Sequence, residues 1–268
     1  MTKAKTGSII YSAKIYALKG FENMDFGKYI AHRGLHGPGA PENSLRAFEN
    51  AVNKGVPAEL DVRLTKDGRI VVFHDRDLKR MCSVDAEISE FTYEQLSAFT
   101  LKDSGEKIPL LSEVLRLVNG RVPLLIEIKN GAPVWTLEKR LYHMLKDYRG
   151  AYAVESFNPF SLLWFRLYAP DVFRGQLIST HKGKKGSYYL ARLVFARPII
   201  WKVVSKPDFI ACDLRSVSLE SAFAAADIGA DFYTWTANTS ELIDEALKFS
   251  KTVIAENFPD NFNFSDGE

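Results

Sequence analysis

Short apolar runs typical of buried strands alternate with longer amphipathic segments along this chain of 268 residues. The strand-like runs lie at about 29–32, 58–63, 123–128, 151–156, 172–178, 208–212, 232–235 and 252–255. Helical candidates lie between most of them, at 44–54, 111–118, 134–148, 159–168, 219–228 and 241–249. Eight strands that alternate with helices predict an α/β fold of the (β/α)8 barrel type, and a doubly wound open sheet is the alternative. The sequence has no Gly-x-Gly-x-x-Gly or P-loop motif to support the open sheet.

Three segments fall outside this alternation. Residues 1–28 mix basic and apolar side chains without a convincing cleavage site, so we interpret them as a lead-in helix before one domain at 29–268. Residues 75–106 are polar and predict a small insertion after the second strand. Residues 187–204 are aromatic, aliphatic and basic. They are either the fifth barrel helix, broken near Pro198, or a basic amphipathic element that makes a peripheral membrane contact.

Composition restricts the partners and the compartment. The formal net charge of +2 argues against a nucleic-acid-binding protein. Cys82 and Cys212 do not form a C-x-x-C pair, so we expect reduced thiols and a cytoplasmic chain. No uncharged apolar run approaches the roughly 20 residues that a membrane-spanning helix needs.

The stretch most informative about function is AELDVRLTKDGRIVVFHD at 58–75. Two extended segments flank the Asp-Gly pair at 67–68, which is a strong hairpin signal. A two-residue loop there would place Asp61 opposite His74, and Glu59 would share their face of the sheet. A register shift of one residue would send His74 to the other face. An edge hairpin with solvated carboxylates is the alternative interpretation.

Polar clusters also follow the other strand-like runs. His32-Arg33-Gly34 comes after the first run, and Glu127-Ile128-Lys129 closes the run at 123–128. In parallel α/β folds the carboxyl ends of the strands are where ligands bind and catalysis occurs. We therefore expect these clusters to meet at one end of the barrel.

Together these motifs resemble the glycerophosphodiester phosphodiesterase family. The motifs are HRG at 32–34, PEN at 41–43, E-x-D at 59–61, HD at 74–75, E-I-K at 127–129, ESF at 155–157 and WTAN at 235–238. The resemblance covers about residues 29–260. It implies a TIM barrel that uses a divalent cation, usually Ca²⁺ or Mg²⁺. It also implies a small-molecule glycerophosphodiester substrate, hydrolysed to an alcohol and glycerol 3-phosphate.

The resemblance implies a metal site at Glu59, Asp61 and Glu127, with Glu42 as a further candidate. Carboxylate oxygens are hard ligands that suit Ca²⁺ or Mg²⁺ and poorly suit thiophilic metals. No H-E-x-x-H zinc pattern competes with them. The sequence does not decide which of the two cations binds.

The resemblance also implies that His32 and His74 are the catalytic pair. An imidazole titrates near neutral pH and can act as base or acid. The sequence leaves open which one deprotonates the nucleophile, and whether that nucleophile is water or a neighbouring substrate hydroxyl. The candidate substrate-binding residues are Arg33, Lys129, Phe157 and Trp235.

Other features leave alternatives open. Asn43 suits a helix cap and an active-site role equally, and we expect His36 to be a loop residue. Many family members have a Thr-Asp-x-Pro motif after the last strand, whereas this chain has Glu256-Asn257-Phe258-Pro259. The sequence therefore leaves open which alcohol departs from the substrate. Two alternative functions are a lysophospholipase D-like enzyme, whose segment 187–204 handles an acyl chain, and a non-catalytic lipid- or partner-binding barrel.

Overall fold

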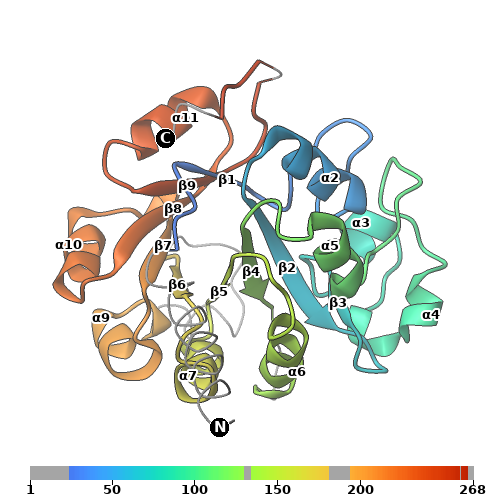
Figure 1. Cartoon of the computed structure of the whole chain (residues 1–268), viewed down its shortest axis with the longest axis horizontal. Coiled ribbons are helices and arrows are strands. Elements are labelled where there is room, and N and C mark those ends of the chain that lie inside the picture. The colour runs from blue at the N-terminus through green and yellow to red at the C-terminus, as the bar shows by residue number, and fades with distance from the viewer. Residues whose placement is uncertain (1–23, 130–133, 181–193, 260, 265–268) are drawn as a thin grey trace, which may run out of the picture.

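The computed structural model describes residues 24–129, 134–180, 194–259 and 261–264. In this part of the chain eight parallel strands close into a ring (Figure 1), because β1 pairs with both β9 and β2. In ring order they are β1 (Tyr29–Ala31), β2 (Ala58–Leu64), β4 (Leu124–Ile128), β5 (Tyr152–Ser156), β6 (Arg174–Ile178), β7 (Phe209–Asp213), β8 (Asp231–Ala237) and β9 (Thr252–Ala255). The ring confirms the predicted (β/α)8 barrel.

Helices surround the ring (Figure 1). They are α2 (Leu45–Lys54), α5 (Leu111–Val118), α6 (Thr136–Leu145), α7 (Pro159–Tyr168), α9 (Pro198–Ile200), α10 (Leu219–Asp227) and α11 (Ser240–Ala246). Local sequence explains where they begin. Ser44, Ser218 and Thr239 cap α2, α10 and α11, since each side-chain oxygen accepts a hydrogen bond from a backbone N–H in the first turn.

Side chains alternate between two cores along each strand. On β4, Leu124 and Ile126 pack outward against the helices, whereas Leu125 packs inside the ring. The inside cluster, here called the inner core, consists of Met24, Phe26, Ile30, Leu125, Ala153, Leu177, Phe209, Ala211, Tyr233 and Ile254. Phe209 and Tyr233 stack with ring centroids 4.5 Å apart. Apolar side chains therefore fill the ring, as expected for a packed barrel.

The predicted lead-in helix at 1–28 lies mostly outside the described residues. Residues 24–28 are described and are not helical, so the prediction is wrong for that part. Met24 and Phe26 are buried in the inner core instead, and Phe26 meets Tyr233 edge to face at 6.5 Å. Burial of these two side chains outweighs the local helical preference.

The hairpin after β2 has a different register from the predicted one. Strand β3 (Ile70–Val72) lies outside the ring and pairs antiparallel with β2, with Val62 opposite Val72, so Asp61 faces Phe73 and not His74. The loop has three residues, because the Thr65 N–H donates to the Arg69 carbonyl at 3.0 Å. Gly68 ends that loop at a φ of 74°, the left-handed conformation typical of a three-residue hairpin loop.

Residues 75–106 form short elements beside β3. These are α3 (Lys79–Cys82), η1 (Ile88–Glu90) and α4 (Tyr93–Leu96). They share an apolar cluster that joins the insertion to β3, made of Val71, Phe73, Leu78, Met81, Ile88, Leu96, Leu101 and Ile108. The insertion is therefore packed firmly against the barrel next to the hairpin.

The second half of segment 187–204 is described, and residues 187–193 are not. Helix α9 begins at Pro198, where the sequence predicts a break in the fifth barrel helix, and continues into the π-helical turn η2 (Trp201–Ser205). Trp201 is buried, but Ile199 and Val203 are each 61% exposed. Among the described residues, no helix is both long enough and apolar enough to cross a membrane.

Candidate active site

A pocket of about 390 Å³ opens at the carboxyl ends of the ring strands. Its lining residues are His32, Arg33, Glu59, His74, Glu127, Lys129, Glu155, Phe157, Leu177, Arg215, Trp235, Thr236 and Ile254. The structure thus brings together both predicted catalytic histidines, all four predicted substrate-binding residues and two of the predicted metal ligands. Leu177 and Ile254 also belong to the inner core, which forms the floor of the pocket.

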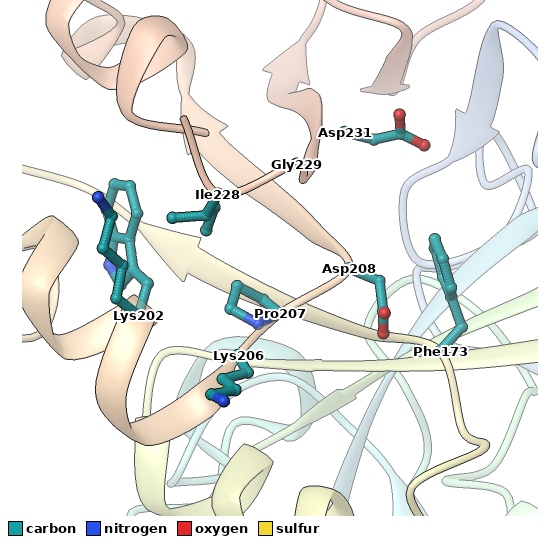
Figure 2. A pocket seen from close by; sticks show the side chains of 9 residues that line it. Phe173, Lys202, Lys206, Pro207, Asp208, Ile228, Gly229 and Asp231 are labelled. Atoms are coloured by element: carbon teal, nitrogen blue, oxygen red, sulfur yellow. The ribbon is translucent and has the colours of Figure 1, made fainter. Parts of the chain in front are cut away.

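A larger hollow of about 490 Å³ lies at the opposite end of the barrel (Figure 2). Phe173, Asp208 and Asp231 line it, and they come just before or at the start of β6, β7 and β8. Its two carboxylates already have cationic partners, because Asp231 pairs with Lys251 at 2.8 Å and Asp208 lies 3.9 Å from Arg174. The smaller pocket is therefore the better candidate site, since its carboxylates are less fully paired.

Four carboxylates lie next to one another at the mouth of the ring. Strand pairing aligns Asp61 of β2, Glu127 of β4 and Glu155 of β5 in one row, and Glu59 lies one layer below. Glu59, Glu127 and Glu155 are buried, and each presents an oxygen within 4.8 Å of the others. Glu155 is part of the ESF motif at 155–157, but the sequence assigned it no role. The signal was an acidic residue at the end of an apolar strand, two positions before the Phe157 that we had singled out.

The surroundings of these carboxylates shift their pKa values in different directions. Burial, followed by repulsion from neighbouring carboxylates, raises the pKa of Glu59 and Glu155 well above the usual range. Burial also raises the pKa of Glu127, although Lys129 opposes this shift from 2.7 Å. Burial alone would raise the pKa of Asp61, but Lys129 and other nearby cationic groups lower it below its usual value. Two carboxylates therefore have a close cationic partner at Lys129, and two do not.

These residues fit a divalent cation. One oxygen each of Glu59 and Glu155 is buried without a hydrogen-bond partner, whereas the buried Asp61 Oδ1 lies 3.2 Å from Lys129 Nζ. Uncompensated buried carboxylates are costly, and a bound cation is one of the few groups that can neutralise several of them at once. Because every donor is a carboxylate oxygen, the set suits Ca²⁺ or Mg²⁺.

Each predicted catalytic histidine is held by a carboxylate through Nδ1. His32 Nδ1 lies 2.9 Å from Glu256 Oε2, and His74 Nδ1 lies 2.7 Å from Asp75 Oδ1. A carboxylate accepts the Nδ1 proton, which leaves the Nε2 lone pair of a neutral ring free. Burial lowers the pKa of both rings, to about 4 for His74. Both therefore suit a role as base at neutral pH, and the geometry does not rank one above the other.

Glu256 is the carboxylate in the unusual ending after the last strand. It binds His32, and His36 Nε2 lies 3.5 Å from the same oxygen. The departure from the family ending thus supplies a partner for a predicted catalytic residue. His36 is not among the residues that line the pocket, in agreement with its predicted loop position.

Arg33 and its neighbours are fixed by the loop between β1 and α2. The Arg33 backbone N–H donates to Glu59 at 2.8 Å, and Nη1 donates to Glu42 at 2.8 Å. Gly34 has a φ of 77°, and a Cβ there would lie 2.9 Å from that of Ala47, so only glycine lets the turn approach α2. Asn43 donates its side-chain N–H to Asp61 at 2.8 Å, which favours its active-site role over the cap.

Glu42 lies outside the buried trio of glutamates. Both of its oxygens accept hydrogen bonds from arginines, one from Arg33 and Arg80 together and one from Arg80 alone. Two guanidinium groups therefore already neutralise Glu42, and its assignment as a further metal ligand stays a prediction.

The opposite wall of the pocket is aromatic and basic. Phe157 and Trp235 meet edge to face with centroids 5.6 Å apart, and the indole N–H donates to the Ala211 carbonyl at 3.0 Å. Arg215 also lines the pocket, although its guanidinium pairs with Asp213 at 2.8 Å. No motif marked Arg215 in the sequence. It adds a third cationic side chain, beside those of Arg33 and Lys129.

Comparison with known proteins finds two named relatives at about one third identity. A glycerophosphodiester phosphodiesterase from Caldanaerobacter subterraneus is 36% identical over 159 residues, 55% of this chain and 65% of that protein. Human lysophospholipase D is 35% identical over 134 residues, 45% of this chain and 41% of that protein. The matches thus span less than two thirds of either relative.

A solved structure shows the same fold. A phosphodiesterase from Oleispira antarctica, in complex with the product sn-glycerol-3-phosphate, has a TM-score of 0.72 at 22% identity over 86% of this chain and 93% of that chain. A family model for the glycerophosphoryl diester phosphodiesterase family matches residues 32–261, which include both histidines and all four carboxylates of the mouth. The chain therefore belongs to the glycerophosphoryl diester phosphodiesterase family.

Proposed function

We propose that this chain hydrolyses glycerophosphodiesters to an alcohol and glycerol 3-phosphate. The observation that carries the proposal is one pocket that holds two carboxylate-bound histidines, a buried carboxylate cluster and cationic side chains. A phosphodiester is an anion at neutral pH, so its hydrolysis needs charge neutralisation and proton transfer on both sides of phosphorus. The pocket contains groups for each of these tasks.

In this mechanism the histidines move the protons. One of His32 and His74 takes a proton at Nε2 from the attacking hydroxyl. The other enters the step as the imidazolium, which the bound anionic diester favours, and donates its Nε2 proton to the oxygen of the departing alcohol. Glu256 and Asp75 stabilise whichever imidazolium forms, since each already binds Nδ1. Arg33 can contact two phosphate oxygens through its planar guanidinium.

We propose that Glu59, Asp61 and Glu127 hold a divalent cation, with Glu155 as a fourth carboxylate. When bound, the cation would supply Lewis-acid stabilisation of negative charge on the phosphate oxygens. Lys129 lies 2.7 Å from Glu127 and 3.2 Å from Asp61, so it shares the neutralisation of these two groups. The choice between Ca²⁺ and Mg²⁺ depends on ligand number and flexibility.

Assay of released glycerol 3-phosphate tests the proposal. The chain is treated with a chelator and supplied with glycerophosphocholine or glycerophosphoethanolamine, with Ca²⁺, with Mg²⁺ or with neither. We expect release that depends on cation and that His74→Ala abolishes almost completely. No release from any diester with either cation would contradict the proposal and favour a non-catalytic binding barrel.

A second candidate is lysophospholipase D-like activity at the same site, with the chain at a membrane surface. The relative named lysophospholipase D is consistent with it. The exposed apolar side chains Ile199 and Val203 flank the half-exposed Lys202 in the sequence, a pattern that suits an anionic lipid surface, although Lys202 also pairs with Asp227. A cytoplasmic location accords with the free thiols of Cys82 and Cys212.

Co-sedimentation with vesicles tests the membrane contact. We expect binding to anionic vesicles at low salt, weaker binding at high salt, and loss of binding in an Ile199→Ser/Val203→Ser variant. The matched control is Leu219→Ser on α10, where another exposed apolar side chain lies outside segment 187–204. Equal sedimentation of wild type with and without vesicles would remove the membrane contact but would leave the hydrolase proposal intact.

A further inference from the structure

Arg80 comes from α3 of the insertion and lies between two carboxylates. Its Nε donates to Asp75 Oδ2 at 2.6 Å. Its two terminal nitrogens donate to the two oxygens of Glu42, both at 2.7 Å. The guanidinium therefore uses two edges, each directed at a different carboxylate, which is a geometry that only arginine can provide.

Each of these carboxylates in turn holds a side chain of the candidate site. Asp75 Oδ1 lies 2.7 Å from His74 Nδ1. Glu42 Oε1 accepts the Arg33 Nη1–H at 2.8 Å. Arg80 thus links the proposed acid–base histidine to the proposed phosphate-binding arginine, because it forms one ion pair with the carboxylate that holds each of them.

Neither of these site residues is held by regular backbone structure. His74 follows the end of β3, and Arg33 lies in a turn after β1 with a φ of 56°. The Arg63 guanidinium fixes the His74 carbonyl at 3.0 and 2.6 Å, but a bond to the backbone does not orient the imidazole ring. The Asp75 carboxylate that does so is itself held by Arg80.

The insertion can hold Arg80 in place because it has a packed core. Met81 and Leu78, which flank the Lys79-Arg80 pair, are buried in the cluster that joins the insertion to β3. The Arg80 side chain is 46% exposed, so its position depends on its two carboxylate partners as well as on this packing.

We propose that Arg80 is a positioning residue that sets His74 and Arg33 in their relative geometry, and that presenting Arg80 is a function of the insertion. This inference rests on the proposed roles of His74 and Arg33. Loss of Arg80 leaves both carboxylates ionised and adjacent, so they repel each other and release both side chains. Small displacements of catalytic groups lower turnover steeply.

The test compares Arg80→Ala and Arg80→Lys with the control Arg76→Ala. Arg76 lies in the same insertion and pairs with Glu87 at 2.9 Å, but its side chain is 72% exposed and touches no site residue among the described contacts. Turnover of glycerophosphocholine is measured with and without millimolar guanidinium ion, and melting temperatures are measured alongside.

We expect Arg80→Ala to lower kcat by about 10- to 100-fold. Guanidinium ion should restore part of this activity, because Arg80 is accessible to solvent, whereas equal sodium chloride should not. Turnover by Arg80→Lys should remain low, since an ammonium group cannot donate to both carboxylates along two edges as a guanidinium does. Arg76→Ala should stay within about twofold of wild type, as is typical of an exposed ion pair.

Two outcomes would overturn the inference. In the first, Arg80→Ala turns over the diester as fast as Arg76→Ala does, while His74→Ala is inactive. This result would refute the role of Arg80 but leave the proposed function intact. The other is a loss that guanidinium does not reverse, together with a lower melting temperature, which would make Arg80 a support of the fold alone. A wild-type chain that does not hydrolyse the diester would instead refute the proposed function.

Discussion

At the scale of single residues, the two histidines of the pocket differ in how they are held. His32 depends on Glu256, which is distant in sequence, whereas His74 depends on Asp75, its neighbour in the chain. Both arrangements fix the ring through Nδ1 and leave Nε2 for the substrate. The roles of the two rings can therefore be separated by replacing either the ring or its partner.

Replacement of His74 tests its part in proton transfer. We expect His74→Ala to lower kcat by about 10²- to 10⁴-fold, because that is the range contributed by one general acid or base. Cation affinity should be nearly unchanged, since His74 is not one of the clustered carboxylates. His143 lies exposed on α6, so His143→Ala is the matched control. Near-full turnover of His74→Ala would remove this residue from the mechanism.

Replacement of Glu155 tests the fourth carboxylate. We expect Glu155→Gln to weaken Ca²⁺ or Mg²⁺ binding by about 10- to 100-fold, measured by titration calorimetry without substrate. Asp208→Asn at the opposite end of the barrel is the control, because it removes a carboxylate far from the mouth. Unchanged cation affinity with a raised KM would instead make Glu155 a contact for a substrate hydroxyl.

The sequence predicts the roles of some site residues and misses the roles of others. His32, Glu59 and Glu127 were found because each lies in a short polar motif at a strand end. Glu155 lies in the ESF motif and Arg80 in no motif, but the roles of both were missed because they arise from strand register and from packing of the insertion, which bring together residues distant in sequence.

At the scale of elements, the strands of the ring could be predicted because both of their faces are buried. Parallel strands inside a barrel consist of apolar runs that stand out from the amphipathic helices. The hairpin register could not be predicted in the same way. A glycine after Asp67 suits a two-residue loop and also the last position of a three-residue loop, since both need a positive φ. The register depends on which of these loops forms.

Arg63 provides a test of how the hairpin supports the site. Its guanidinium donates to the backbone carbonyls of His74 and Lys129, which follow the strands β3 and β4. We expect Arg63→Met to lower the free energy of unfolding by about 1–3 kcal/mol, because buried carbonyls lose their donors. Arg69→Met on the same hairpin is exposed and should change it by at most about 0.5 kcal/mol. Equal urea midpoints for the two variants would show that these bonds are not needed.

At the scale of the whole molecule, the carboxylate cluster couples stability to pH and to cation. The pKa values of Glu59 and Glu155 are raised in the folded chain, by burial first and then by repulsion. Such groups bind protons more tightly when the chain is folded. Their stabilising contribution is therefore present below the unfolded pKa of about 4.3 and is lost as pH rises through the folded values.

A cation that neutralises the cluster should restore this loss. We expect the rise in melting temperature on adding Ca²⁺ or Mg²⁺ to be larger near about pH 8 than near about pH 5, where protons compete with the cation. The pKa of His74 is lowered from 6.5 to about 4, so between these pH values its contribution to stability rises with pH, opposite to that of the two glutamates. Melting temperatures are therefore compared with and without cation at each pH. A cation effect equal at both pH values would contradict the assignment.

The apolar floor of the pocket limits the route by which molecules can enter and leave the site. Leu177 and Ile254 close the pocket from below, and Met24 and Phe26 pack into the same inner core. The barrel axis is thus a blind end, and if the proposed function holds, the diester would enter and both products would leave by the same mouth. On the proposed function, a diester with a bulky alcohol would project outward past the rim, so the loops above the ring would limit the size of the departing group more than the depth of the cavity would.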